Sequence, residues 1–324
     1  MTAADRSSDT PADDAADDAE EQAPPACVMS FNATDPSGAG GIAGDVSTIA
    51  AMGAHALPVV TAVLLRDTAE IFEHSALDGD LVVEQARSVL EDITIAAWKV
   101  GFLGSSENVG AVAEVLSDYP DVPLVAYLPN LSWVEEDEQQ AYLDAFRELV
   151  LPQTTVLVGN HQTLTDFLLP EWSAERPASA RELAVAASER GTRFVLVTSM
   201  PVAAAPAKGG SPPAQFVDNV LASAQGAVTG EKFERFEAAF VGAGDTLSAA
   251  LAALLASGAD LHAAVGEALT FLDQALDAGF RPGMGNVIPD RFFWALPPGE
   301  DDEDAPDEPA TDDAAAPKNP RHVH

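Results

Sequence analysis

The stretch Val241–Gly258, VGAGDTLSAALAALLASG, carries more information about the fold than any other part of this 324-residue chain. Three small residues, Gly242, Ala243 and Gly244, come before an acid, Asp245, and a run rich in alanine and leucine with helical character follows. The first turn of a helix has backbone N–H groups without partners, and the helix dipole adds partial positive charge there. We therefore expect a small-residue loop and a helix start that together form an anion hole.

Asp245 has two possible roles at this helix start. An aspartate there commonly caps the helix by accepting a hydrogen bond from a backbone N–H group. However, Thr246 and Ser248 offer other capping groups, and a small-residue loop before an acid suits phosphoryl transfer. In that role Asp245 accepts the proton of an attacking hydroxyl group. The local sequence leaves both roles open.

A second glycine-rich stretch, Thr34–Gly41 (TDPSGAGG), directly follows the apolar run Cys27–Phe31. Glycines allow backbone N–H groups to approach a ligand closely, and open α/β folds bind ligands at the carboxyl ends of their strands. Asp45 lies one helical turn after Gly41, where it could accept a hydrogen bond from such a ligand. The stretch is neither a dinucleotide fingerprint nor a P-loop, and a plain strand-to-helix turn would have a similar sequence.

Apolar runs typical of strands alternate with helical patterns between residues 26 and 296. This order predicts a single α/β domain with a doubly wound, mostly parallel sheet and helices on both faces. We expect strands at 27–31, 57–65, 96–103, 124–128, 154–158 and 194–198, and helices at 41–52, 80–90, 108–117, 139–150, 178–190, 246–256 and 262–278. Residues 199–230, rich in proline, glycine and alanine, are expected to form a long loop or flap.

The formal net charge of −36 is concentrated partly at the two ends of the chain. Residues 1–25 hold eight acids and one arginine, and residues 297–324 hold nine acids against Lys318 and Arg321. Such segments bury too little apolar surface to fold alone, so both are expected to be disordered acidic tails. The overall charge also disfavours nucleic acid and anionic membranes as partners, because their phosphates would be repelled.

The cysteine count and the apolar runs indicate a cellular location. Cys27 is the sole cysteine, so no intrachain disulfide is possible, which fits a reducing compartment. The acidic N-terminus lacks the apolar stretch of a signal peptide. The longest apolar helical pattern, which starts at Leu247, is too short to span a bilayer. We therefore expect a soluble, cytoplasmic protein.

The two glycine-rich loops together resemble a known pattern. DPSGAGGIAGDVSTIAAMGAHALPVVTAVLLRDT, residues 35–68, resembles the opening of the bacterial hydroxymethylpyrimidine/phosphomethylpyrimidine kinases. GAGDTLSAALAA, residues 242–253, resembles the signature with the catalytic residue in the wider ribokinase-like superfamily. Lys99–Leu103 (KVGFL) and Gly283–Asn286 (GMGN) also resemble family motifs. The similarity extends from about residue 27 to residue 295.

The resemblance implies a ribokinase-like fold, commonly a homodimer, that uses ATP and Mg²⁺. It implies phosphorylation of hydroxymethylpyrimidine and then of its monophosphate, in thiamine biosynthesis. Asp245 would be the catalytic base, beside an anion hole formed by Gly242, Ala243 and Gly244. The residues implied to bind substrate are Gly40, Asp45, Arg66 and Phe102, and those implied to bind the nucleotide are Asn160 and Thr198. No metal ligand is assigned.

The chain departs from the family pattern on the metal and nucleotide side. Tyr127–Asn130 (YLPN) replaces an Asp-Pro-Val element and contains no acid. In an Asn-x-x-Glu element that helps to hold magnesium, Asn160 is retained but Thr163 replaces the glutamate. Thr198–Pro201 (TSMP) replaces a Lys-Gly-Gly-His element near the nucleotide. Because Mg²⁺ prefers hard oxygen ligands such as carboxylates, these replacements weaken a magnesium site.

The substrate side has one departure of its own. Arg66 stands where the family usually has a glutamine that reads the pyrimidine edge. An arginine only donates hydrogen bonds, which suits a phosphate or a carboxylate. Three hypotheses follow: an active kinase of a hydroxymethylpyrimidine, a non-catalytic ligand-binding homologue, and a kinase of a related alcohol such as pyridoxal.

Overall fold

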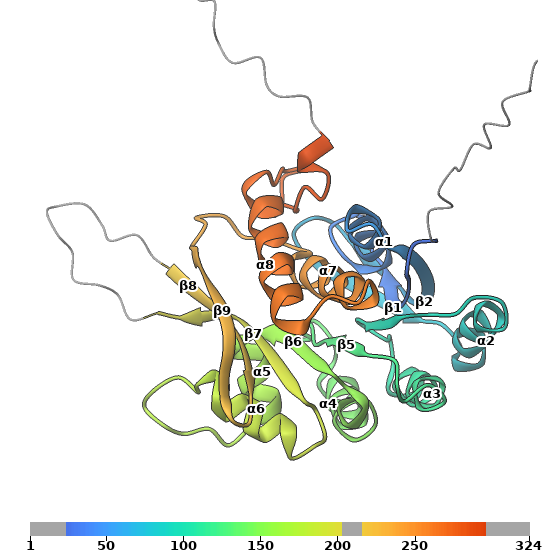
Figure 1. The fold of residues 1–324 in the computed structure, drawn as a ribbon, viewed down its shortest axis with the longest axis horizontal. Helices are drawn as coiled ribbons and strands as arrows, with labels where there is room; N and C mark the ends of the chain where they lie inside the picture. The colour runs from blue at the N-terminus through green and yellow to red at the C-terminus, as the bar shows by residue number, and fades with distance from the viewer. Residues whose placement is uncertain (1–23, 203–215, 296–324) are drawn as a thin grey trace, which may run out of the picture.

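A computed structural model describes residues 24–202 and 216–295 (Figure 1). The strands are β1 Cys27–Thr34, β2 His55–Arg66, β3 Ile71–Ala76, β4 Ala97–Val100, β5 Leu124–Tyr127, β6 Val156–Asn160, β7 Phe194–Pro201, β8 Phe216–Ser223 and β9 Gly226–Glu234. The α-helices are α1 Gly41–Ala51, α2 Gly79–Leu90, α3 Ser106–Ser117, α4 Glu136–Ala145, α5 His161–Leu168, α6 Ala180–Ser188, α7 Ala243–Ala256 and α8 Leu261–Asp277. A π-helical turn, Phe146–Val150, extends α4, and 3₁₀ turns lie at Leu151–Gln153 and Phe293–Ala295.

The described strands form one sheet in the order β3-β2-β1-β4-β5-β6-β7-β8-β9. The strands from β2 through β7 in this order pair in parallel, whereas β3, β8 and β9 pair antiparallel with their neighbours. Helices cover both faces, with α7 and α8 on one face and α3 to α6 on the other (Figure 1). The predicted α/β fold with a mostly parallel, doubly wound sheet is confirmed.

The central strands are buried on both faces, which explains their continuous apolar runs. In β1, Met29 and Phe31 face the layer that contains α2 to α6, whereas Val28 faces α1, α7 and α8. This alternation follows from the two-residue period of side chains along a strand. Helix α7 is almost wholly buried, from Thr246 to Leu254, because its many alanines permit close packing on all sides.

The structure corrects the secondary structure expected from the sequence. Residues 199–230 were expected to be a flap, but the described part of this segment contains the end of β7, all of β8 and the start of β9. The segment 199–230 is rich in Gly, Ala and Pro, and FVDNVLAS, the sequence of β8, has no strict alternation of apolar and polar residues. Strand β3 and helix α5 were not predicted, since both are short and their neighbours carry the stronger pattern.

Several expectations concern residues beyond this fold. Residues 1–23 and 297–324 of the two expected tails lie outside the described residues, so the domain boundaries stay a prediction.

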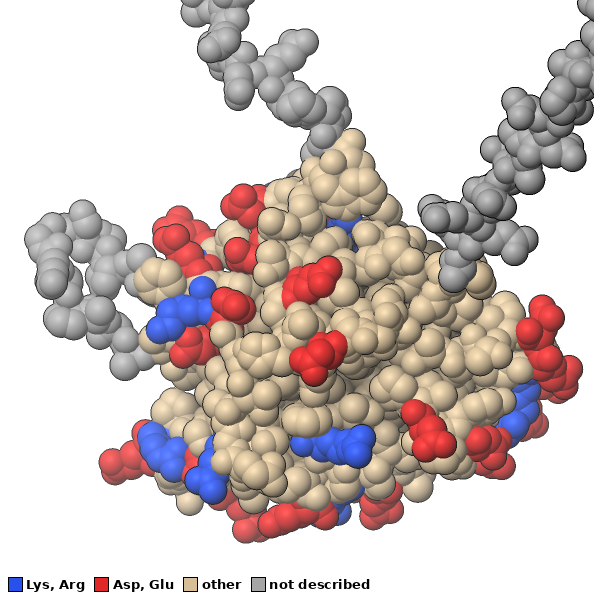
Figure 2. All heavy atoms as spheres, viewed as in Figure 1, with Lys and Arg blue, Asp and Glu red and all other residues tan. Residues whose placement is uncertain are grey.

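Acidic side chains are spread over much of the face shown in Figure 2. In the part of the chain that the structure describes, no helix is both long enough and apolar enough to cross a membrane.

The topology creates a crevice between β1 and β4. The chain leaves β1 through α1 to reach β2 on one side, whereas β4 continues through α3 to β5 on the other side. Ligands in doubly wound folds bind at such a switch point, outside the carboxyl ends of the strands. Both glycine-rich loops and the start of α7 lie at this edge.

Candidate active site

A cavity of about 1260 Å³ opens at the carboxyl edge of the sheet. Gly40 and Gly41 of the first loop and residues 242–245 of the second form one wall of it, which we call the loop wall. Small-molecule pockets typically measure about 300–1,000 Å³, so two small ligands can lie side by side here. The two loops that the sequence singled out therefore belong to one site.

Helix α7 begins at the loop wall with free donors. Gly242 is its N-cap residue and has a φ of 90°, and no side chain caps the helix. The first helical hydrogen bond runs from the N–H group of Thr246 to the carbonyl oxygen of Gly242. Among the described residues, the N–H groups of Ala243 and Gly244 have no acceptor. The helix start thus presents the free N–H donors that an anion hole requires, and the anion hole itself stays a prediction.

Gly242 cannot be replaced by a larger residue without moving the loops apart. A Cβ atom there would lie 1.6 Å from the carbonyl oxygen of Ala39, in the first glycine-rich loop. The positive φ of Gly242 is also a conformation that L-residues rarely adopt. The two loops therefore touch through backbone atoms, and this contact requires glycine.

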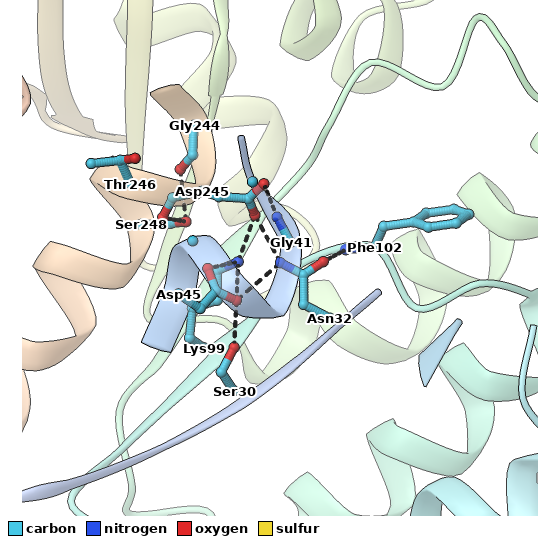
Figure 3. A network of polar contacts seen from close by, with 12 residues as sticks. Ser30, Asn32, Gly41, Asp45, Lys99, Phe102, Gly244, Asp245, Thr246 and Ser248 are labelled. Atoms are coloured by element: carbon cyan, nitrogen blue, oxygen red, sulfur yellow. Dashed lines mark hydrogen bonds and ion pairs between the residues drawn. The ribbon is translucent and has the colours of Figure 1, made fainter. Parts of the chain in front are cut away.

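The carboxylate of Asp245 does not cap its own helix; it is held by three donors from other elements (Figure 3). Its Oδ1 accepts hydrogen bonds of 2.8 Å from Lys99 Nζ and 2.8 Å from Asn32 Nδ2. Its Oδ2 accepts one of 3.0 Å from the backbone N–H group of Gly41. Of the two roles left open by the sequence, the capping role is wrong.

Lys99 lies beneath the loop wall and connects the carboxylate of Asp245 to that of Asp45 (Figure 3). Its fully buried ammonium group is 2.8 Å from an oxygen of Asp245 and 2.8 Å from an oxygen of Asp45. Asn32 Nδ2 and Ser30 Oγ also donate to Asp45, at 2.9 Å and 2.6 Å. One cation and two anions thus share a single buried network, which we call the Lys99 cluster: Ser30, Asn32, Asp45, Lys99 and Asp245.

Burial and ion pairing oppose each other within the Lys99 cluster. Burial alone would lower the pKa of Lys99, but the carboxylates of Asp245 and Asp45 outweigh it and raise this pKa above its usual value. Burial alone would raise the pKa of Asp245, but Lys99, Gly41 and Asn32 together lower it below its usual value. For Asp45, burial prevails and its pKa is raised. Asp245 is therefore the more acidic carboxyl group, held ionised at the cavity.

Arg291 ties the two glycine-rich loops together from the C-terminal side. This side chain is buried, and its Nε donates to Thr246 Oγ1 of α7 at 3.1 Å. Its Nη1 and Nη2 donate to the carbonyl oxygens of Gly38 and Ala39. Since one planar guanidinium group contacts both loops, Arg291 sets the spacing between the first glycine-rich loop and the start of α7.

Of the sequence-predicted substrate and nucleotide residues, five line the cavity: Gly40, Arg66, Phe102, Asn160 and Thr198. Arg66 Nη1 is paired with Asp35 Oδ2 at 3.2 Å. Asn160 accepts a hydrogen bond from the N–H group of Thr163 at 2.9 Å and so caps α5.

Asp45 requires a correction. It was expected to face a ligand above the first loop, but it is fully buried and does not line the cavity. One helical turn does carry its side chain towards the carboxyl edge of the sheet. There the ammonium group of Lys99 lies between Asp45 and the cavity-lining Asp245. Asp45 therefore acts on the site through Lys99.

Sequence reasoning missed four residues of the site: Asn32, Lys99, Tyr127 and Arg291. Lys99 did carry a signal, because it stands within the apolar run AAWKVGFL, and a charge in a buried strand needs a partner. Asn32 carried a weaker signal of the same kind in β1. For Tyr127 and Arg291 the local sequence offered none.

Comparisons with known proteins identify the family of this chain. Residues 35–290 match the sequence model of the phosphomethylpyrimidine kinase family. The hydroxymethylpyrimidine/phosphomethylpyrimidine kinase of Streptomyces coelicolor is 30% identical over 277 residues, which cover 84% of this chain and 96% of that protein. The chloroplastic thiamine biosynthetic bifunctional enzyme TH1 of Arabidopsis thaliana is 30% identical over 259 residues, 77% of this chain. The match spans 46% of that longer enzyme.

A solved structure supports the fold. Pyridoxal kinase of Bacillus subtilis, determined as an ADP complex, superimposes with a TM-score of 0.71. The superposition covers 84% of this chain and 100% of that one, at 21% sequence identity. At this identity the likeness establishes the ribokinase-like fold alone.

Proposed function

The chain belongs to the phosphomethylpyrimidine kinase family, and we propose that it uses ATP to phosphorylate hydroxymethylpyrimidine and then the resulting monophosphate, as in thiamine biosynthesis. One observation carries the proposal: the ionised carboxylate of Asp245 lies at the cavity wall directly beside the uncapped start of α7. A proton acceptor and an anion hole are the two groups that phosphoryl transfer to an alcohol requires.

In the proposed reaction the substrate hydroxyl group lies against Asp245. Among the described residues, only Gly41 donates a hydrogen bond to Oδ2 of Asp245, so this oxygen keeps a lone pair for the hydroxyl proton. As that proton moves to Asp245, the substrate oxygen forms a bond to the γ-phosphorus, and the bond from that phosphorus to its bridging oxygen breaks to release ADP. The N–H groups of Ala243 and Gly244 stabilise the charge of the transferred group.

An aromatic surface supports a flat heterocyclic substrate next to the loop wall. Phe102 lines the cavity, and its ring centroid lies 5.1 Å from that of Trp133, which also lines it. The two rings meet edge to face, and the face of one ring offers an apolar contact for a pyrimidine. Arg66 and Gly40 border the same part of the cavity in the proposed complex.

The far part of the cavity suits a nucleotide. Apolar side chains of Phe233, Phe240, Leu272 and Leu276 line it and can contact a purine base. Asn160 and Thr198 supply polar groups between this surface and the anion hole. In our proposal the nucleotide is ATP, with its terminal phosphate at the start of α7.

The residues present do not form a dedicated magnesium site. Within residues 24–202 and 216–295, no group of three or more His, Cys, Asp or Glu side chains could hold a metal ion. Asp245, the acid nearest the anion hole, is already paired with Lys99. Mg²⁺ keeps most of its water and needs few protein ligands when phosphates bind it. We therefore propose that it enters as the Mg·ATP complex.

Arg66 supports a second candidate substrate. Its side chain lines the cavity, and Nη1 and Nε already have acceptors in Asp35 and Asp67, while Nη2 has none among the described residues. A free guanidinium N–H group suits a negatively charged substituent. A related hydroxymethyl compound such as a pyridoxal-type alcohol is therefore the alternative to hydroxymethylpyrimidine.

Homodimer formation and a cytoplasmic location are also part of the proposal. Val63 and Leu65 of β2 and Phe72 of β3 are exposed apolar residues near one edge of the sheet, which suits a contact with a second copy. Light scattering of the purified chain would test this: a monomer at micromolar concentration contradicts the dimer. For the location, the single cysteine is the supporting observation.

A coupled ADP-release assay with Mg·ATP and three alcohols tests the function. The alcohols are hydroxymethylpyrimidine, its monophosphate and pyridoxal. The substitution Asp245→Asn should lower kcat by about 10²–10⁴-fold through loss of the base. Because Lys99 and the other donors lower the pKa of Asp245, kcat/KM of the wild type should show no loss of this base at any pH where an ordinary aspartate is still ionised.

The matched control is Asp121→Asn, which removes an exposed carboxylate in a loop and should leave kcat unchanged. If Asp245→Asn has the same kcat as the wild type, Asp245 is excluded as the base. Thermal stabilisation by the pyrimidine without any by Mg·ATP, and without turnover, would instead identify a non-catalytic ligand-binding homologue.

A further inference from the structure

Tyr127 ends β5 and lines the cavity. Its ring lies directly against the start of α7. A Cβ atom on Gly244 would be 2.2 Å from Tyr127 Cζ and 2.4 Å from Tyr127 Oη. A Cβ atom is only about 1.5 Å from its Cα, so the hydroxyl group lies against the backbone that forms the anion hole.

The hydroxyl group of Tyr127 is available for a ligand. No residue in the described part of the chain forms a hydrogen bond with it, although the residue lines the cavity. Tyr142 shows the contrasting case, because its buried hydroxyl group accepts a hydrogen bond of 3.1 Å from the N–H group of Leu103 and does not line the cavity. A tyrosine hydroxyl group in a polar site normally has a partner, so Tyr127 lacks one that a ligand can supply.

The surroundings of Tyr127 keep its hydroxyl group protonated. Burial raises its pKa far above the usual value, and the negative charge of Asp245 raises it further. Lys99 Nζ lies 5.9 Å from the ring centroid, but it is already paired with two carboxylates. A neutral phenol donates a hydrogen bond to an anion and is a poor ligand for Mg²⁺.

We propose that Tyr127 is a catalytic residue whose hydroxyl group donates a hydrogen bond to the phosphoryl group in transfer, beside the N–H groups of Ala243 and Gly244. This inference rests on the proposed kinase function. Tyr127 keeps its own proton throughout, and the proton of the substrate alcohol goes to Asp245. The new bond joins the alcohol oxygen to phosphorus, and the bond to the bridging oxygen of the nucleotide breaks.

These three donors would stabilise the negative charge of the transferred phosphoryl group. They would do so in a site that has few carboxylates to hold a metal ion. Two backbone N–H groups and one phenol would surround oxygens of the transferred group, all of them neutral donors with fixed positions. The fixed position of Tyr127 comes from its contact with Gly244, which permits no side chain.

The substitution Tyr127→Phe tests the inference because it removes the hydroxyl group and keeps the ring contact with Gly244. We expect kcat to fall about 10- to 100-fold, somewhat less than the loss typical of one oxyanion-hole donor, with KM for the alcohol and for Mg·ATP within about twofold. The matched control Tyr142→Phe also removes one phenol. It should lower the Tm and leave kcat within about twofold, because its hydroxyl group bonds only to Leu103. Equal kcat for wild type and Tyr127→Phe overturns the inference.

A binding measurement gives an independent readout. Thermal shift is measured with Mg·ADP alone and with Mg·ADP plus aluminium fluoride, which mimics a phosphoryl group in transfer. The wild type should gain stability from the fluoride beyond that from Mg·ADP. Tyr127→Phe should keep the Mg·ADP shift and lose most of this additional gain. A full additional gain in the variant contradicts the inference.

The substitution Tyr127→Asp separates a hydrogen-bond donor from a metal-ligand position. A carboxylate against the anion hole would repel the phosphoryl group, so kcat should fall below that of Tyr127→Phe. A rise in kcat, or tighter dependence on Mg²⁺, would show that the position serves a metal and overturn the inference. If the wild type neither turns over any of the three alcohols nor is stabilised by Mg·ADP, the proposed function fails as well.

Discussion

The two sides of the cavity differ in how firmly their polar groups are held. At the loop wall, Asp245 has three donors and Lys99 joins two carboxylates in a buried network. Four other residues that line the cavity belong to strands, and we call them the strand-end wall: Asn160 at the end of β6, Thr198 and Ser199 in β7, and Asn219 in β8. Only neutral side chains make up the strand-end wall.

The strand-end wall also has unsatisfied groups and local strain. Asn219 Oδ1 accepts a hydrogen bond of 3.1 Å from the N–H group of Ser199, but its buried Nδ2 has no partner among the described residues. Ser199 has a φ of 56°, the only positive φ of a non-glycine residue in the described chain. The loop wall thus holds its charged groups in one buried network, whereas the four residues of the strand-end wall are neutral and less constrained.

The largest expected effect comes from removing the cation of the Lys99 cluster. Lys99→Met leaves Asp45 and Asp245 buried beside each other without a positive charge. We expect the free energy of unfolding to fall by about 3–5 kcal/mol, as measured by urea denaturation at pH 7. The matched control is Lys232→Met, at a half-exposed lysine 3.7 Å from Asp218, where the loss should stay below about 1 kcal/mol. Equal losses in the two variants would remove the contrast between the walls.

A smaller effect is expected at Arg291, which contacts both glycine-rich loops. Arg291→Lys keeps the charge but cannot contact Thr246, Gly38 and Ala39 at once. We expect a loss of about 2 kcal/mol in the free energy of unfolding, together with a lower kcat, because the spacing of the loops changes. Arg87→Lys, at an exposed ion pair with Asp118, is the control and should change neither quantity measurably. An unchanged kcat in Arg291→Lys would show that the loops hold their spacing without it.

The smallest expected effect sharpens the picture of the strand-end wall. Ser199→Gly relieves a positive φ that costs an L-residue about 1–2 kcal/mol, and adds a glycine entropy cost of about 0.5–1 kcal/mol. The net result should be a stabilisation of about 0.5 kcal/mol, visible as a small rise in Tm. Ser223→Gly in β8 has no such strain to relieve, so it should lower the Tm. A lower Tm in both variants would mean that Ser199 is not strained.

Much of the fold was predictable because its signals are local. The seven expected helices overlap α1 to α4 and α6 to α8, since the 3.6-residue pattern and the capping residues lie within each segment. The β8–β9 hairpin was missed because its glycine, alanine and threonine content is equally common in loops. Its strand character depends on pairing with β7 at the edge of the sheet.

The candidate site was predictable only in part, for a related reason. The sequence GAGDT predicts a helix start with an acid beside it, because both features depend on a few adjacent residues. Whether Asp245 caps the helix or faces a ligand depends on Lys99 and Asn32, which the local sequence does not connect to it. Asp45 lies one helical turn after the loop, as expected, but its carboxylate is paired with Lys99.

The sequence by itself determined the order of β1, β2, β4 to β7 and seven helices, the two glycine-rich turns and the family, because these depend on residue periodicity, on backbone freedom and on motifs in order. Only the tertiary structure decided the partners of Asp245. Asn32, Lys99 and Gly41 lie 213, 146 and 204 residues away from it along the chain. The parallel pairing of β1 with β4 puts Ser30 opposite Lys99, and the packing of α1 and α7 on these strands places both carboxylates around one buried ammonium group. A buried charge is stable only where the fold brings its counter-charges to it, and that arrangement does not exist until the strands have paired.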